Sequence, residues 1–216
     1  MKLYTKPGAC SLADHIALIW SGLPFELQIV DYATMKSPEY LKMNPAGAVP
    51  MLEDGGWILT QNAAILHYIC DKAPDAGLEG GSDPRTRAEV NRWLSFVNAD
   101  LHPTYYPIFG STKYLEDEAV IARTQENSRQ KLTALYQRIN DRLAEVEWLG
   151  GTPRASIADA YTYVTLRWAR GLKIDLAGMD ALDRFEQRMQ ADPAVQAALK
   201  AEGGPQTPLR IRVHAS

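Results

Sequence analysis

The chain has 216 residues, of which 46% are hydrophobic and 23% are charged, and its formal net charge is −3. This length accommodates one large domain or two smaller ones with real cores. The balance of 23 basic and 26 acidic side chains, without a long run of one sign, argues against a nucleic-acid-binding protein. No stretch approaches the roughly 18 apolar residues of a membrane span, and the first residues lack the apolar core of a secretory signal. We therefore expect a cytoplasmic protein with no membrane partner.

The first distinctive stretch is Lys6-Pro7-Gly8-Ala9-Cys10-Ser11-Leu12, a turn between a predicted strand at 1–5 and a predicted helix at 11–20. Cys10 falls at the N-terminus of that helix. Unpaired backbone N–H groups and the helix dipole stabilise a thiolate there, so we expect its pKa to fall below the roughly 8.5 of free cysteine. A reactive thiol and a small buried side chain are both open interpretations of Cys10.

The segments that follow predict a small α/β unit. Residues 25–30 alternate as a strand, and strand–helix–strand order implies a right-handed crossover and a parallel pair. Ser37 and Pro38 predict a short helical turn over 37–43, with serine as the cap and proline at the first helical position. Residues 49–60 read as an antiparallel hairpin around Asp-Gly-Gly, and 63–71 as a helix capped by Gln61-Asn62.

The rest of the chain is helical in pattern. We predict helices at 85–101, 119–147, 156–171, 180–189 and 193–200, with Pro103 and Pro107 bending or ending the first of them. Ser156 and Asp159 form a capping box. We expect domains at 1–76 and 85–203, a Pro/Gly-rich linker at 77–84 and a disordered tail at 204–216. The two cysteines, Cys10 and Cys70, make no disulfide framework, and Cys70 is expected in the core.

This order of segments, with Ser156-Ile157-Ala158-Asp159 in the second domain, resembles the cytosolic glutathione transferases, and the turn at Cys10 resembles their bacterial beta class. The resemblance implies a fold of class α/β plus all-α. Its N-terminal thioredoxin-like domain has a mixed four-stranded sheet with helices, and its C-terminal domain is all-helical. It also implies a homodimer that uses glutathione as co-substrate and needs no other cofactor and no metal.

The resemblance also assigns glutathione contacts. Cys10 takes the place of the beta-class cysteine beside the glutathione sulfur, and His102 that of the histidine reaching toward this sulfur from the second domain. Val49-Pro50 resembles the family's cis-proline pair, whose backbone binds the cysteinyl part. Gln61 and Asn62 stand where an acidic residue and a serine hold the γ-glutamyl end, so Gln61 offers only a neutral acceptor to the ammonium.

Other assignments are less specific. Ser11 is a candidate donor to the sulfur, or simply a residue at a helix N-terminus. Lys36 is a candidate partner of the glycyl carboxylate, or solvated surface. Ser95 replaces an asparagine expected near glutathione, and Pro103 replaces a lysine. The candidate lining of a hydrophobic electrophile pocket is Tyr105, Tyr106 and Phe109.

Three functions follow from these residues. The first is conjugation of the glutathione thiolate to a hydrophobic electrophile, an activity associated with detoxification. The second is glutathione-dependent thiol–disulfide exchange through Cys10. The alternative from another class is a non-catalytic binding protein for glutathione conjugates or hydrophobic ligands. His15 and His67 have no spacing typical of zinc ligands, so no metal site is expected.

Overall fold

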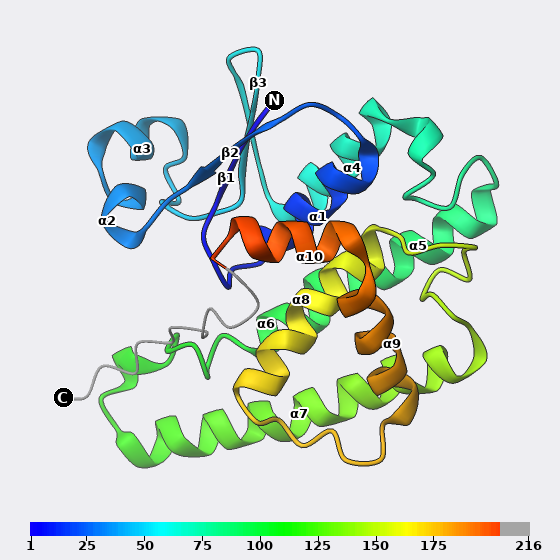
Figure 1. Cartoon of the computed structure of the whole chain (residues 1–216). Coiled ribbons are helices and arrows are strands. Elements are labelled where there is room, and N and C mark those ends of the chain that lie inside the picture. The colour runs from blue at the N-terminus through cyan, green and yellow to red at the C-terminus, as the bar shows by residue number, and fades with distance from the viewer. Residues whose placement is uncertain (204–216) are drawn as a thin grey trace.

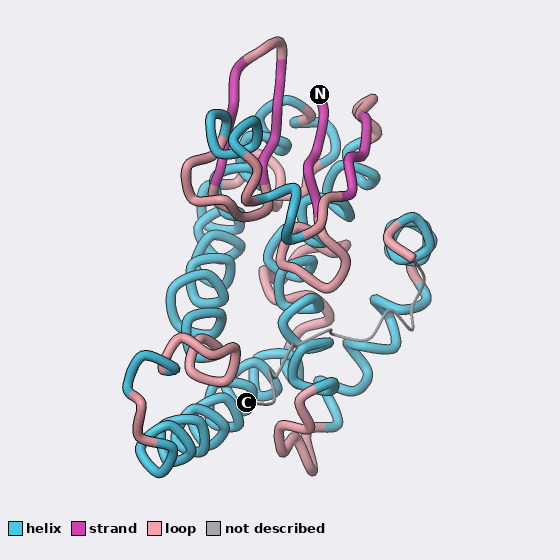
Figure 2. The backbone as a smooth tube through the Cα atoms, turned by 90° about the vertical axis from the view of Figure 1, so that its left-hand side faces the viewer, coloured by secondary structure: helices cyan, strands magenta, loops and turns pink. Residues whose placement is uncertain are grey.

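The computed structural model describes residues 1–203, so the predicted tail at 204–216 lies outside the described residues. The sheet and its helices form one part of the molecule, and the remaining helices form the other (Figures 1 and 2). The sheet part ends with α4 (Asn62–Lys72), and the helical part begins with α5 (Pro84–Phe96). The linker at 77–84 stays a prediction, and its last residue, Pro84, is already the first residue of α5.

The sheet has four strands in the order β2-β1-β3-β4. They are β1 (Lys2–Thr5), β2 (Glu26–Ile29), β3 (Met51–Asp54) and β4 (Trp57–Thr60). β1 pairs with β2 in parallel, whereas β1 with β3 and β3 with β4 are antiparallel. The predicted parallel pair followed by a hairpin is therefore confirmed.

Helices cover both faces of this sheet. α1 (Leu12–Ser21) and α4 lie on one side, and the short helices α2 (Tyr32–Met35) and α3 (Pro38–Met43) lie on the other (Figure 1). As predicted, Ser37 caps α3, since its hydroxyl accepts from the backbone N–H of Tyr40 at 3.2 Å. The sequence did not indicate α2, which Asp31 caps in the same way by accepting from Thr34 N at 2.8 Å.

The helical part differs from the prediction at its first helix. α5 continues into a π-helical turn at Val97–Leu101 and then into α6 (His102–Thr104), where the prediction had one α-helix over 85–101. A π-helical turn holds more residues than an α-helical one, so it changes which side chains share a face. The other helices are α7 (Glu118–Glu145), α8 (Ile157–Gly171), α9 (Asp180–Ala191) and α10 (Pro193–Ala201). Short 3₁₀ turns occur at Pro74–Ala76 and Lys113–Leu115.

The predicted capping box at the start of α8 is confirmed. The buried Asp159 carboxylate accepts from Ser156 N at 2.9 Å and from Leu149 N at 3.0 Å. It therefore satisfies backbone donors both at the helix terminus and in the preceding loop, which fixes where this central helix begins.

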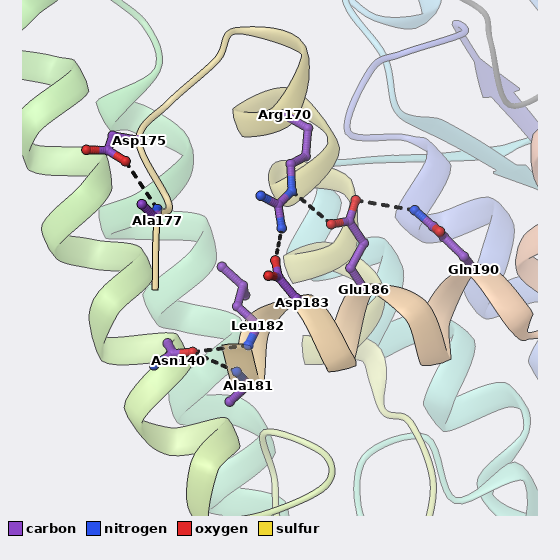
Figure 3. A network of polar contacts seen from close by, with 9 residues as sticks. All are labelled: Asn140, Arg170, Asp175, Ala177, Ala181, Leu182, Asp183, Glu186 and Gln190. Atoms are coloured by element: carbon purple, nitrogen blue, oxygen red, sulfur yellow. Dashed lines mark hydrogen bonds and ion pairs between the residues drawn. The ribbon is translucent and has the colours of Figure 1, made fainter. Parts of the chain in front are cut away.

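Polar contacts hold α9 against α7 and α8 (Figure 3). Asn140 of α7 accepts from the backbone N–H groups of Ala181 and Leu182, both at 3.1 Å, and so caps the first turn of α9. The Arg170 guanidinium at the end of α8 pairs with Asp183 and donates to Glu186 at 2.8 Å. These contacts fix the register of the three helices.

The last helix, α10, returns to the sheet part and lies beside α1 (Figure 1). Trp20 Nε1 donates to Asp192 Oδ1 at 3.2 Å. At the other end of α10, buried Glu202 accepts from Thr5 Oγ1 at 2.9 Å and pairs with His15 at 3.0 Å. Within residues 1–203, no helix combines the length and apolarity that crossing a membrane requires.

Candidate glutathione site

A cavity of about 280 Å³ opens between the two parts of the molecule. Its lining from the sheet part is Cys10, Asn44, Ala46, Ala48, Val49, Pro50, Thr60, Gln61 and Asn62. The helical part contributes Asn98, His102, Tyr106 and Tyr161. The cavity therefore gathers residues that are up to 151 positions apart in the sequence, from Cys10 to Tyr161.

Cys10 lies just before α1 and is half-buried. Its Sγ lies 3.9 Å from the carbonyl oxygen of Val49, to which the thiol donates. Burial, followed by the nearby Asp14 carboxylate, raises the pKa of Cys10 to about 12, although the N–H groups of Cys10 and Ser11 oppose this change. The predicted lowering of this pKa is therefore wrong for the protein without ligand, because desolvation outweighs the helix N-terminus.

The turn before Cys10 is tied to the helical part. Gly8 has a φ of +80°, a conformation that favours glycine. Its carbonyl oxygen accepts from Trp168 Nε1 at 2.9 Å. Trp168 is buried, and its hydrogen bond fixes the position of the cysteine turn.

His102 faces the same cavity from α6. Its Nδ1 is hydrogen-bonded to the Tyr161 hydroxyl, and its ring packs against Trp168 with centroids 4.8 Å apart. Burial lowers the pKa of His102 to about 4, so the ring is neutral at pH 7. Because Nδ1 is occupied by Tyr161, Nε2 is the ring nitrogen left to meet a ligand.

The remaining predicted sheet-side residues lie around Cys10. The Val49-Pro50 peptide bond is cis, as expected. Gln61 precedes α4 with a φ of +77° and is exposed, whereas Asn62 begins the helix and is only 5% exposed. The cavity thus meets a helix N-terminus, where free N–H groups favour a carboxylate.

Five predicted residues do not line this cavity, and three of them are Ser11, Tyr105 and Phe109. Ser11 is fully buried, and its Oγ lies 2.7 Å from Thr5 Oγ1, so the structure does not support a contact with the sulfur. Tyr105 is also fully buried, with its hydroxyl bonded to Tyr136 and the Thr165 carbonyl. Phe109 stacks on Tyr105. Of the predicted aromatic set, Tyr106 lines the cavity.

The other two residues, Ser95 and Lys36, are predicted glutathione contacts. Ser95 is exposed and outside the cavity lining, and Asn98 lies there in its place. Lys36 also lies outside the lining, although its Nζ donates to the carbonyl of Gly47 at 3.0 Å, between two lining residues. Tyr161 and Asn44 also line the cavity, and no sequence motif indicated them. For Asn98 a signal existed, because it precedes His102 by four residues.

No group of three or more His, Cys, Asp or Glu side chains placed to hold a metal occurs among residues 1–203. His15 and His67 are instead paired with the carboxylates of Glu202 and Glu79.

Comparison with known proteins identifies the family. Residues 14–77 match the pattern of the "Glutathione S-transferase, N-terminal domain". A glutathione S-transferase of Xanthomonas campestris is 62% identical over 94% of this chain and 99% of its own length. The structure of a glutathione S-transferase from Xylella fastidiosa has a TM-score of 0.90 at 57% identity, covering 94% of this chain and 98% of that one. A bacterial beta class enzyme of Sphingomonas chungbukensis has a TM-score of 0.81 at 35% identity, covering 94% and 99%. This chain belongs to the glutathione S-transferase family, with the bacterial beta class among its structural neighbours.

Proposed function

We propose that the protein is a glutathione transferase that conjugates the glutathione thiol to hydrophobic electrophiles. The observation that carries the proposal is one cavity at the N-terminus of α4, which is lined by Cys10, the cis Val49-Pro50 pair and His102. Family membership supports glutathione as the thiol. The same likeness supports a cytoplasmic homodimer that acts in detoxification.

In this proposal glutathione binds as an extended peptide along the sheet part. Its γ-glutamyl carboxylate accepts from the N–H groups at the start of α4, and its cysteinyl backbone pairs with Val49. Gln61 supplies a neutral oxygen atom to the ammonium group. Lys36, exposed near the Gly47 carbonyl, remains the proposed partner of the glycyl carboxylate.

The sulfur then lies between Cys10 and His102. With a pKa of about 12, Cys10 keeps its proton at neutral pH, so it donates S–H to the glutathione thiolate. His102 is neutral and offers Nε2 to the same sulfur. The thiolate electron pair forms a C–S bond with the electrophilic carbon, and the leaving group departs with the pair of the bond that breaks. The thiol proton passes to solvent.

The electrophile approaches from the helical side, where Tyr106 and Asn98 line the cavity. Thiol–disulfide exchange ranks second, because it requires the Cys10 thiolate, which burial disfavours. A non-catalytic binding protein is the remaining alternative, and the neutral Gln61 is the feature that favours it.

The test is a pair of measurements on the purified chain: calorimetric titration with glutathione, and conjugation of a chloronitrobenzene. We expect binding and turnover in the parent protein, with turnover reduced in Cys10→Ala and His102→Gln. Cys70→Ala is the matched control, because Cys70 is a buried cysteine outside the cavity lining, and it should leave both measurements unchanged. Binding without turnover across several electrophiles would select the binding protein, and absence of both would refute the proposal.

A further inference from the structure

A buried acid lies one helical turn beyond Cys10. Asp14 is on α1 and 0% exposed. Its carboxyl faces the Asn62 side chain of α4, which lines the cavity. Nothing in the proposed conjugation uses Asp14, yet a buried carboxyl is retained only where it finds hydrogen-bonding partners.

The contact between Asp14 and Asn62 has two arrangements. With its amide nitrogen toward Asp14, Asn62 donates to Oδ1 at 2.9 Å and to Oδ2 at 2.6 Å, which suits an ionised carboxylate. With its amide oxygen there, the same contact needs a proton on Asp14. The protonation state of Asp14 therefore decides whether the amide nitrogen or the amide oxygen of Asn62 points away from Asp14.

The end of the Asn62 amide that points away from Asp14 is linked to His102 through Tyr161. Tyr161 shares a side-chain hydrogen bond with Asn62, and its hydroxyl is also bonded to Nδ1 of His102. A hydroxyl has one proton, so it donates to one of these partners and accepts from the other. The orientation of the amide thus fixes which way the Tyr161 proton points.

We propose that Asp14 is a positioning residue that sets the ring tautomer of His102 through the Asn62 amide and the Tyr161 hydroxyl. With Asp14 protonated, Asn62 donates to Tyr161, Tyr161 donates to Nδ1, and His102 carries its proton on Nε2. With Asp14 ionised, Tyr161 donates to Asn62, and Nδ1–H of His102 donates to Tyr161. The two states differ by the one proton that Asp14 releases to solvent.

The consequence rests on the proposed function, in which His102 meets the glutathione sulfur. With a protonated Asp14, Nε2–H is a hydrogen-bond donor that stabilises the thiolate. With an ionised Asp14, Nε2 presents a lone pair and this stabilisation is lost. One carboxyl that never touches the ligand thereby decides whether the histidine donates or accepts.

The surroundings favour the protonated state. The titratable groups that face Asp14 are Cys10 before α1, Tyr161 on α8 and Glu202 at the end of α10, which is itself paired with His15. Burial and then Glu202 raise the pKa of Asp14 well above its ordinary value. The raised pKa of Asp14 widens the pH range over which we expect the Nε2–H tautomer of His102.

The test is ¹⁵N NMR of the full chain, labelled at histidine and at the aspartate carboxyl carbon, without glutathione. Long-range correlations give the His102 tautomer, and the Asp14 ¹³Cγ shift gives its protonation. His102→Gln and Asp14→Asn identify the two signals. Across a pH titration, the fraction of the Nε2–H tautomer should equal the fraction of protonated Asp14. Because no glutathione is present, the result does not depend on whether the protein conjugates it.

Two variants make the test specific. Tyr161→Phe removes the linking hydroxyl, so the tautomer should cease to follow Asp14. Tyr105→Phe removes another buried hydroxyl of the helical part, one bonded to Tyr136 and Thr165, and should leave the coupling intact. A parent tautomer that does not follow Asp14, or coupling that survives Tyr161→Phe, would overturn the proposal. Once the two signals are assigned, the titration is read in the parent protein, so it decides the matter even if Tyr161→Phe does not fold.

Discussion

Replacing Trp168 by phenylalanine tests how the helical part holds the cysteine turn. The indole Nε1 donates to the Gly8 carbonyl at 2.9 Å, two residues before Cys10. Phenylalanine keeps an aromatic ring among His102 and Tyr105 but has no donor. The substitution therefore removes the one hydrogen bond while preserving most of the packing.

The magnitude follows from two terms. Leaving the part-buried Gly8 carbonyl without its donor costs about 1–3 kcal/mol. The smaller ring buries less apolar area, which costs about 1 kcal/mol more. We expect Trp168→Phe to lower the free energy of unfolding by about 2–4 kcal/mol. If only ~1 kcal/mol of this loss lowers the free energy of opening the cysteine turn, Cys10 becomes accessible about fivefold more often.

Two assays read these effects, urea unfolding for stability and the rate of Cys10 alkylation by iodoacetamide for local opening. Trp20→Phe is the matched control, since Trp20 Nε1 also donates to an oxygen of the helical part, Asp192 Oδ1, away from the cysteine turn. It should lower stability without accelerating alkylation. Equal alkylation rates in Trp168→Phe and the parent, or equal acceleration in both variants, would refute the reasoning.

Three other predictions concern titration and capping. Alkylation of Cys10 without glutathione should still rise about tenfold per pH unit between pH 8 and 10, because its pKa is about 12, and a plateau below pH 9 would contradict this. Asn140→Ala removes the cap of α9 and should destabilise the protein by about 1 kcal/mol in urea unfolding, whereas Gln137→Ala, one turn earlier on the exposed face of α7, should have little effect. The hydrogen bond from His67 is the main cause of the lowered pKa of Glu79. Its contribution to stability is therefore full above the unfolded pKa and lost as the pH falls through the folded one. In Glu79→Gln, the free energy of unfolding should accordingly fall less steeply as the pH is lowered in the acid range. An unchanged dependence on pH would rule this out.

The sequence predicted the strand pairing and two of the helix caps well, because these depend on local patterns. The hairpin turn, the Ser37 cap and the Asp159 capping box all involve residues within a few positions of one another. The pairing of Cys10 with His102 came from family resemblance, since no local pattern brings residues 92 positions apart to one cavity.

The errors have physical causes that lie beyond local pattern. Ser95 was named because the family resemblance implies an asparagine near glutathione at that position, but Ser95 is exposed and Asn98 lines the cavity from the π-helical turn. Tyr105 looked like pocket lining, but its hydroxyl finds Tyr136 and Thr165 in the core, partners far away in the sequence. Asp14 passed unnoticed because an acid in the first turn of a helix is usually solvated.

The account stands on where the glutathione sulfur binds, and a crystal structure of the protein with glutathione measures this directly. We predict the sulfur within hydrogen-bonding reach of both Cys10 Sγ and Nε2 of His102, with the γ-glutamyl carboxylate at the start of α4. Glutathione bound outside this cavity, or with its sulfur turned away from both side chains, would contradict the account.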